Sequence, residues 1–315
     1  MNDNSPFTRI NSQDWLDLKK DVTLKISEKE LSSLLSIGHN IEINEVKTTY
    51  LPLARLILSY FENAQQARKK QQSSIKTTNI KKVPFIIAIS GSVAVGKSTM
   101  ARLLQKLLSY YSPDFKIDLI TSDGFLYPNK ILESLNLMTR KGFPESYDVD
   151  SLLLFLDSIK SAHRYVKAPV YSHLIYDIVP NEYITVDCPD MMILEGINVL
   201  QLKSPIYSTK NGWRADLFDF SIYIDADEEN VKQWYVKRFM KLRKIAADNP
   251  NSFFTKYLNW DEDKARLYAT EIWEKINLKN LLEHIKPTQK RADLILYKEK
   301  NHKVKSINLR NFKGV

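Results

Sequence analysis

The sequence predicts an α/β fold, in which a mostly parallel sheet carries helices on both faces and follows an N-terminal helical extension. Three observations predict it. Five short apolar runs occur after residue 83, and each is long enough for one buried strand. Stretches with the 3.6-residue spacing of amphipathic helices lie between these runs. Residues 1–83 are polar and carry helical patterns. Continuously apolar strands that alternate with helices are typical of parallel sheets.

The N-terminal part, residues 1–83, is expected to be a helical extension that ends in a basic linker. Ser27 and Glu30 stand at the spacing of a capping box, which indicates the start of a helix. Residues 50–70 repeat apolar side chains at helical spacing, with Pro52 in the first turn. The stretch "KKQQSSIKTTNIKK" (69–82) is polar and basic and predicts a loop. Residues 84–315 form the second predicted unit.

Within this second unit, strands and helices are predicted to alternate. The strands are expected at 84–90, 116–123, 190–196, 219–226 and 293–298. The helices are expected at 97–111, 149–162, 228–246 and 261–285. Ligands of such sheets bind at the carboxyl ends of the strands, so functional side chains are expected there.

Composition limits the possible partners and location. The net charge of +9 predicts an anionic partner, and nucleotides, coenzymes and nucleic acids are all anionic. The basic residues are spread along the chain without an RNA-binding signature, so we expect no nucleic-acid partner. The single cysteine, Cys188, excludes an intrachain disulfide and fits a reducing compartment. The polar start is unlike a signal peptide, and the apolar runs are too short for a bilayer. We therefore expect a cytoplasmic protein without a membrane partner.

The stretch "GSVAVGKS" (91–98) matches the phosphate-loop pattern G-x-x-x-x-G-K-[ST] and stands between a predicted strand and a predicted helix. Such a loop wraps its backbone N–H groups around a triphosphate, and the helix dipole adds to the attraction. The lysine reaches the β- and γ-phosphates, and the serine hydroxyl binds Mg²⁺. The fold is therefore expected to be of the P-loop NTPase type. The nucleotide is expected to contact Gly91, Ser92, Val93, Ala94, Val95, Gly96, Lys97, Ser98 and Thr99.

Two acidic residues end predicted strands near this loop. Asp123 in "TSDGF" can accept the proton of a substrate hydroxyl that attacks the γ-phosphorus. The alternative is a solvated aspartate of a turn. Glu195 in "MMILEG" can hold Mg²⁺ directly or through water, or can simply bind a backbone amide. The absence of an N-K-x-D signature disfavours a GTPase.

Two further stretches carry candidate substrate contacts. Tyr235, Arg238 and Leu242 share one face of the basic helix "QWYVKRFMKLRK" (233–244). An arginine there can neutralise a transferring phosphoryl group, although basic helix faces are also commonly just solvated. In "APVYSHLIYD", strand alternation puts Tyr171 and His173 on one side. The alternative for both is a core position with a satisfied polar tip.

With these residues together, the chain resembles the bacterial type I pantothenate kinases. The matching strings run in the family's order from about residue 50 to the C-terminus: "GSVAVGKST", "TSDGFLYPN", "KGFPESYD", "APVYSHLIYD", "ILEGINVLQ", "DFSIYIDA", "WYVKRF" and "EIWEKINLKNL". "KGFPESYD" and "PVYSHLIYD" are far more specific than the phosphate loop. Uridine kinases and phosphoribulokinases are similar in the loop and the strand-end carboxylates but lack these two strings.

The resemblance implies ATP- and Mg²⁺-dependent phosphorylation of the terminal hydroxyl of pantothenate, the first step of coenzyme A synthesis. It implies Asp123 as the base, Lys97 and Ser98 on the ATP phosphates and Mg²⁺, and Arg238 on the transferring group. The pantothenate pocket would consist of Asp123, Tyr171, His173, Tyr235, Arg238 and Asn277. A homodimer is also implied.

Feedback inhibition by coenzyme A, in competition with ATP, is a further implication. Lys97, Arg102 and His173 would bind the inhibitor. The chain departs from the family at Leu242, where phenylalanine is common, and at Phe253, where tyrosine is frequent. The missing ring at residue 242 removes a stacking surface for the coenzyme and predicts weaker feedback.

Two alternatives remain at this point. A uridine kinase-like or phosphoribulokinase-like enzyme for another small molecule can carry the same core. Outside enzymes, a nucleotide-dependent regulator that binds nucleic acid would show ATP-modulated binding with a steep salt dependence.

Overall fold

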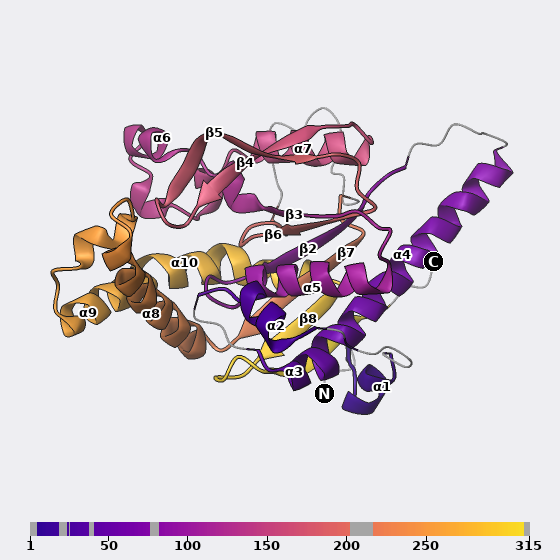
Figure 1. The fold of residues 1–315 in the computed structure, drawn as a ribbon, viewed down its shortest axis with the longest axis horizontal. Helices are drawn as coiled ribbons and strands as arrows, with labels where there is room; N and C mark the ends of the chain where they lie inside the picture. The colour runs from indigo at the N-terminus through magenta and orange to yellow at the C-terminus, as the bar shows by residue number, and fades with distance from the viewer. Residues whose placement is uncertain are drawn as a thin grey trace.

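The computed structural model describes residues 5–18, 24, 26–37, 41–75, 82–201 and 217–311. A seven-stranded sheet with the order β1-β9-β8-β7-β2-β6-β3 forms its centre (Figure 1). All five predicted strands are present and are the parallel strands of this sheet: β2 (Phe85–Gly91), β3 (Ile117–Thr121), β6 (Met191–Glu195), β7 (Phe220–Ala226) and β8 (Leu294–Lys298). The predicted α/β class is confirmed.

The central strand β2 is continuously apolar because both of its faces are covered. Every residue of β2 is buried, as expected for the middle of a parallel sheet. β2 pairs with β6 on one side and with β7 on the other, and β3 pairs with β6. In this register Thr121 lies beside Glu195, and Gly91 lies beside Ile224. The carboxyl ends of β2, β3 and β6 therefore meet at one edge of the sheet.

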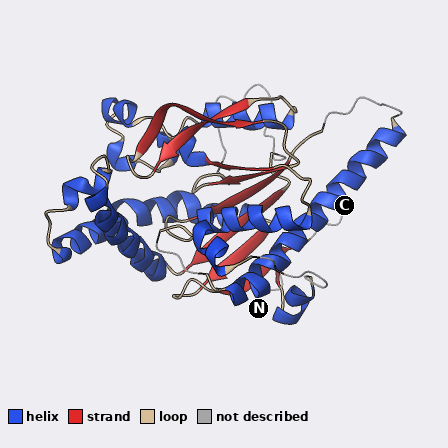
Figure 2. Ribbon diagram, in the orientation of Figure 1, coloured by secondary structure: helices blue, strands red, loops and turns tan. Residues whose placement is uncertain are grey.

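Helices surround the sheet, as Figure 2 shows. α5 (Lys97–Tyr111), with the predicted bounds, follows the phosphate loop and contacts β2, β3 and β6. α4 (Leu51–Ser74) packs the Phe61 ring against the Phe85 ring of β2, at a centroid distance of 5.7 Å. Further along the chain come α6 (Asn129–Ser134), α7 (Val149–Lys160), α8 (Glu228–Ile245), α9 (Glu262–Ile272) and the short α10 (Leu278–Asn280).

The predicted loop over residues 69–82 is wrong in its first part. α4 continues to Ser74, because lysine, glutamine and serine tolerate an exposed helix face and nothing in this stretch breaks the helix. Residues 76–81 of the predicted linker lie outside the described residues.

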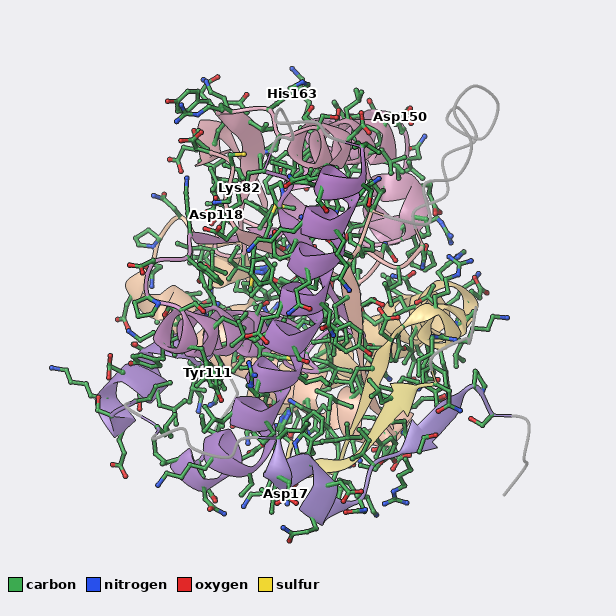
Figure 3. All side chains as sticks on the ribbon, turned by 90° about the vertical axis from the view of Figure 1, so that its right-hand side faces the viewer. Asp17, Lys82, Tyr111, Asp118, Asp150 and His163 are labelled. Carbon is green, nitrogen blue, oxygen red and sulfur yellow. The ribbon has the colours of Figure 1, made fainter. Side chains whose placement is uncertain are left out.

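The N-terminal extension packs onto α5. α1 (Ser12–Asp17), α2 (Glu28–Leu34) and α3 (Ile43–Glu45) precede a π-helical turn at Val46–Tyr50. The predicted capping box at the start of α2 is present, with Ser27 and Glu30 bonded reciprocally. Tyr111 donates its hydroxyl to the carbonyl of Leu51 at 3.3 Å, and Figure 3 labels this tyrosine beside α4. No helix of the described ranges is long and apolar enough to cross a bilayer.

Three strands were not predicted, and a fourth was expected only as an extended stretch in "APVYSHLIYD". β9 (Val304–Arg310) pairs antiparallel with β8, and β1 (Phe7–Arg9) adds to β9 at the edge of the sheet. β4 (Val166–Ser172) and β5 (Asp177–Val186) form a separate antiparallel pair. Few residues of these strands are buried, and polar residues interrupt them, so they lack the continuous apolar runs that reveal the parallel strands.

The predicted helix over residues 261–285 is interrupted twice by π-helical turns. After α9 come a π turn at Trp273–Asn277, α10 (Leu278–Asn280) and a second π turn at Leu281–Ile285. π turns inside helices are frequent at functional sites. A small second core joins α8, the 3₁₀ turn Phe253–Tyr257 and α9.

Candidate active site

A cavity of about 300 Å³ lies where the carboxyl ends of β2, β3 and β6 meet. The predicted residues that line it come from both the sheet edge and the C-terminal helices: Val93, Ala94, Lys97, Ser98, Asp123, Tyr171, His173, Glu195, Tyr235, Arg238, Leu242, Phe253 and Asn277. Residues that are more than 150 positions apart in the sequence thus face one space. The remainder of the phosphate loop supplies backbone behind this wall.

The phosphate loop has the backbone that its glycines predict. Gly91 and Gly96 have φ angles of +144° and +101°, which side chains disfavour. A Cβ atom on Gly91 would lie 2.5 Å from the carbonyl oxygen of Ile224. Gly96 caps α5 without a side-chain hydrogen bond, so the first N–H groups of the helix are available to an anion.

Lys97 is buried in the cavity wall and donates a hydrogen bond to the carbonyl of Ser92 at 2.9 Å. Burial lowers the pKa of Lys97, and the carboxylates of Glu195 and Asp123 oppose this shift. The buried ammonium therefore lies close to the carboxylates of Glu195 and Asp123. A phosphate group in the cavity would give it a stronger partner than the loop carbonyl.

Ser98 and Glu195 form an oxygen pair at the base of the cavity. The Ser98 hydroxyl donates to Oε1 of Glu195 at 2.8 Å. Burial raises the pKa of Glu195, and Lys97 opposes this shift. Hydroxyl and carboxylate oxygens are ligands that Mg²⁺ prefers. The described residues contain no group of three or more His, Cys, Asp and Glu side chains arranged for a metal. This donor set fits Mg²⁺ that takes its remaining ligands from phosphates and water.

Asp123 lies in a 3₁₀ turn (Ser122–Phe125) directly after β3. Its side chain is 23% exposed. The Tyr147 hydroxyl donates to Oδ1 of Asp123 at 3.3 Å, whereas Oδ2 lies 4.0 Å from Nε2 of His173. Strand β4 passes close above this turn, because a Cβ atom on Gly124 would lie 2.1 Å from the Pro169 carbonyl oxygen. Tyr147 therefore holds one carboxylate oxygen, the other lies on the side of His173, and all three residues line the cavity.

Aromatic side chains of β4 and its following turn line the next wall. The rings of Tyr171 and His173 meet edge to face at a centroid distance of 5.2 Å, so the two side chains lie together as predicted, but His173 belongs to the turn after β4 and not to the strand. Partial removal from water lowers the pKa of His173, and Asp123 opposes the shift. The rings of Phe253 and Tyr176 stack at a centroid distance of 4.6 Å. The phenylalanine at residue 253, where the family frequently has tyrosine, therefore keeps an aromatic contact.

The C-terminal helices contribute Tyr235, Arg238 and Asn277. Among the described residues, Arg238 has no hydrogen-bond or ion-pair partner, so its guanidinium remains available to a ligand. Burial raises the pKa of Tyr235, and a hydrogen bond with Asn277 opposes the shift. Asn277 is the last residue of a π turn and lines the cavity, and its Nδ2 also donates a hydrogen bond to the Ile272 carbonyl at 3.4 Å.

Sequence reasoning missed several residues of the cavity. Lys141 donates to Oδ1 of Asn129 and to the carbonyl of Tyr176, both at 2.6 Å. Burial lowers the pKa of Lys141 to about 8, while Asp177 and Asp123 oppose the shift. Lys141 and Tyr147 both stand in "KGFPESYD". That string resembles the family far more specifically than the phosphate loop does, and this is the feature of the sequence that could have identified both residues as part of the site.

Six predicted ligand-binding residues do not line the cavity: Gly91, Ser92, Val95 and Gly96 of the phosphate loop, and Thr99 and Arg102 of α5. Thr99 accepts a hydrogen bond from the backbone N–H of Ser36 at 3.0 Å. Arg102 donates to the Leu34 carbonyl at 2.8 Å and to the Ser36 hydroxyl at 2.7 Å. Both side chains fasten the segment after α2 to helix α5.

The arrangement has the parts that phosphoryl transfer requires. A phosphate loop, a buried lysine and a serine–glutamate pair can together bind a triphosphate with its metal ion. The Asp123 carboxylate stands at the end of β3 at the same sheet edge, and Arg238, which has no partner among the described residues, lines the same cavity. Phenols, an imidazole and an amide surround the remaining space and can hold a small polar acceptor.

Comparisons with known proteins agree with this chemistry. Residues 86–248 match the model of the phosphoribulokinase / uridine kinase family. The pantothenate kinase of Mesorhizobium japonicum is 50% identical over 307 residues, which cover 97% of this chain and 96% of that protein. The pantothenate kinase of Agrobacterium fabrum is 48% identical over 314 residues, or 97% and 95% of the two chains. The solved structure of a putative fructose transport system kinase from Silicibacter sp. TM1040 has the same fold, with a TM-score of 0.53. The two sequences are 20% identical, and the superposition covers 74% of this chain and 91% of that chain.

Proposed function

This chain belongs to the phosphoribulokinase / uridine kinase family and, within it, to the pantothenate kinases, and we propose on this basis that it transfers the γ-phosphoryl group of ATP to the terminal hydroxyl of pantothenate. The reaction is the first step of coenzyme A synthesis. The observation that carries the proposal is that Asp123 and the phosphate-loop residue Lys97 line one cavity, in a chain that is 50% identical to a pantothenate kinase over nearly its whole length.

Asp123 is the general base in this proposal. Asp123 lines the cavity, and the Tyr147 hydroxyl holds Oδ1 at 3.3 Å, which leaves Oδ2 without a hydrogen-bond partner among the described residues. The hydroxyl of pantothenate transfers its proton to Oδ2 as its oxygen bonds to the γ-phosphorus, and ADP leaves on the opposite side. Such a positioned base contributes about 10²–10⁴ to the rate.

Lys97 and Arg238 stabilise the charge on the transferring group. Lys97 leaves the Ser92 carbonyl and binds the phosphate oxygens of ATP instead. Arg238, whose guanidinium has no partner among the described residues, lines the same cavity. Ser98 and Glu195 would hold Mg²⁺, because their oxygens already lie 2.8 Å apart at the base of the cavity. When bound, the ion neutralises phosphate charge and orients the triphosphate.

Pantothenate is a small anion with two hydroxyls and one amide, and the remaining wall suits these groups. Tyr171, His173, Tyr235 and Asn277 offer phenol, imidazole and amide groups for its hydroxyls, amide and carboxylate. Lys141 adds a cation on the same wall. Burial within aromatic walls lowers the local dielectric constant and strengthens each polar contact.

Coenzyme A is proposed as a feedback inhibitor that competes with ATP through Lys97, Arg102 and His173. Arg102 now binds Leu34 and Ser36, so a coenzyme phosphate would have to share or displace these contacts. A homodimer in the cytoplasm is the proposed state of the enzyme.

An acceptor screen tests the function. Purified protein receives MgATP and, in separate reactions, pantothenate, uridine or ribulose 5-phosphate, and ADP release is followed. We expect pantothenate to give the highest kcat/KM by orders of magnitude. Faster turnover with uridine or ribulose 5-phosphate would reassign the acceptor. ATP-modulated DNA or RNA binding without any acceptor-dependent ADP release would contradict kinase activity altogether.

A further inference from the structure

Lys298 ends strand β8 at the same sheet edge as the phosphate loop, but its side chain does not line the active-site cavity. Only 2% of the residue is exposed, and Nζ donates a hydrogen bond to the backbone carbonyl of Val95 at 3.2 Å. Val95 is also buried and directly precedes Gly96, the cap of α5. The cavity is lined by Val93 and Ala94 but by neither Val95 nor Lys298. Lys298 therefore holds the loop from its outer side.

The buried ammonium group has one acidic neighbour. Glu45, at the end of α3, is only 8% exposed, and burial raises its pKa while Lys298 opposes the shift. Burial likewise lowers the pKa of Lys298 to about 8, and Glu45 opposes this shift. Oε1 of Glu45 has no hydrogen-bond partner within the described residues. A buried ammonium and a buried carboxylate with such incomplete hydrogen bonding add little net stability, because both have lost their contacts with water. A stabilising role alone therefore does not account for Lys298.

The chemistry of the loop supplies a reason. A phosphate loop binds its anion through inward N–H groups, and any carbonyl that turned inward would repel the phosphate oxygens. In this structure two lysines engage two loop carbonyls. Lys97 donates to the Ser92 carbonyl from the cavity wall and can exchange it for a phosphate. Lys298 donates to the Val95 carbonyl away from the cavity and holds it there.

We propose that Lys298 is a positioning residue of the nucleotide site: its ammonium keeps the Val95 carbonyl turned away from the bound triphosphate, and Glu45 of the N-terminal extension balances its charge. The inference rests on the proposed function only in taking the loop as the site of the ATP phosphates. It gives Glu45 a role in nucleotide binding although this residue does not line the cavity.

The test compares Lys298→Met, Lys298→Arg and the double variant Lys298→Met/Glu45→Gln with wild type. The double variant removes both charges and remains informative where Lys298→Met fails to fold because of an unpaired carboxylate. Lys305→Met, an exposed lysine of β9, is the matched control. Calorimetry measures the Kd of MgATP and of magnesium tripolyphosphate, which has no base or ribose. Initial rates give KM for ATP and for pantothenate, and circular dichroism gives Tm.

We expect Kd for both MgATP and magnesium tripolyphosphate to rise about 10-fold or more in Lys298→Met or in the double variant, since a hydrogen bond from a charged donor is lost. Lys298→Arg should recover part of this loss. KM for pantothenate should stay within about 2-fold, and Lys305→Met should match wild type. Unchanged tripolyphosphate binding in a folded variant would overturn the proposal, and a loss confined to ATP would assign Lys298 to the base or ribose instead. Because binding is measured directly, the result stands even if wild type does not phosphorylate pantothenate.

Discussion

The sharpest prediction concerns the carboxylate of Asp123. Substitution to asparagine keeps the size and shape of the side chain, and its carbonyl oxygen can still accept the Tyr147 hydroxyl bond now measured at 3.3 Å. The amide NH₂ then replaces Oδ2, the oxygen that lies 4.0 Å from Nε2 of His173. An amide cannot accept the proton of the pantothenate hydroxyl. We therefore expect kcat to fall about 10²–10⁴-fold, which raises the barrier by about 2.7–5.4 kcal/mol.

The assay for this prediction separates chemistry from binding. Steady-state ADP release gives kcat, and calorimetry gives the Kd of MgATP, which should stay within about 3-fold because the phosphate loop is untouched. Asp114→Asn, on the exposed turn after α5, is the control for a lost carboxylate and should leave both values unchanged. A kcat of Asp123→Asn within about 5-fold of wild type would refute the assignment of the base.

Three other outcomes are expected. Arg238→Met should lower kcat about 10²–10³-fold, with partial recovery in Arg238→Lys, because a charge that stabilises the transferring group is lost; an unchanged kcat would contradict that role. Leu242→Phe should lower the inhibition constant of coenzyme A about 2- to 10-fold by adding an aromatic contact, and equal constants would exclude it. The pKa of Lys141 is about 8 in the folded chain and near 10.4 in the unfolded chain. Between these pH values the unfolded chain binds more protons, so the free energy of unfolding should rise with pH, and it should rise more in wild type than in Lys141→Met. Urea denaturation measures this free energy at each pH, and the same change with pH in both proteins would contradict the prediction.

The parallel core could be predicted from the sequence because burial on both faces requires continuous apolar runs. β2, for example, has every residue buried. The edge strand β9 could not be predicted in this way, because only Ile307 of its seven residues is buried. Its pairing depends on the exposed edge of β8, which is a property of the assembled sheet. The same is true of β1, which is three residues long.

The candidate site divides along the same physical line. The phosphate loop, Asp123 and Glu195 could be predicted because parallel strands bring their carboxyl ends to one edge. Asn277 was reached only through resemblance, because it ends a π turn, where ordinary helical spacing does not apply. Lys298 stands among 46 basic residues and nothing local distinguishes it. Only the fold places its ammonium against the loop carbonyl.

The central claim is that a triphosphate and pantothenate meet across Asp123 in one cavity, and product analysis tests it most directly. Purified protein is incubated with ATP, Mg²⁺ and pantothenate, and the products are identified by ³¹P NMR and mass spectrometry. The account predicts stoichiometric ADP and a phosphomonoester on the terminal hydroxyl of pantothenate, which Asp123→Asn forms at least 100-fold more slowly. Unmodified pantothenate beside intact ATP, or beside ADP and free phosphate, would contradict it.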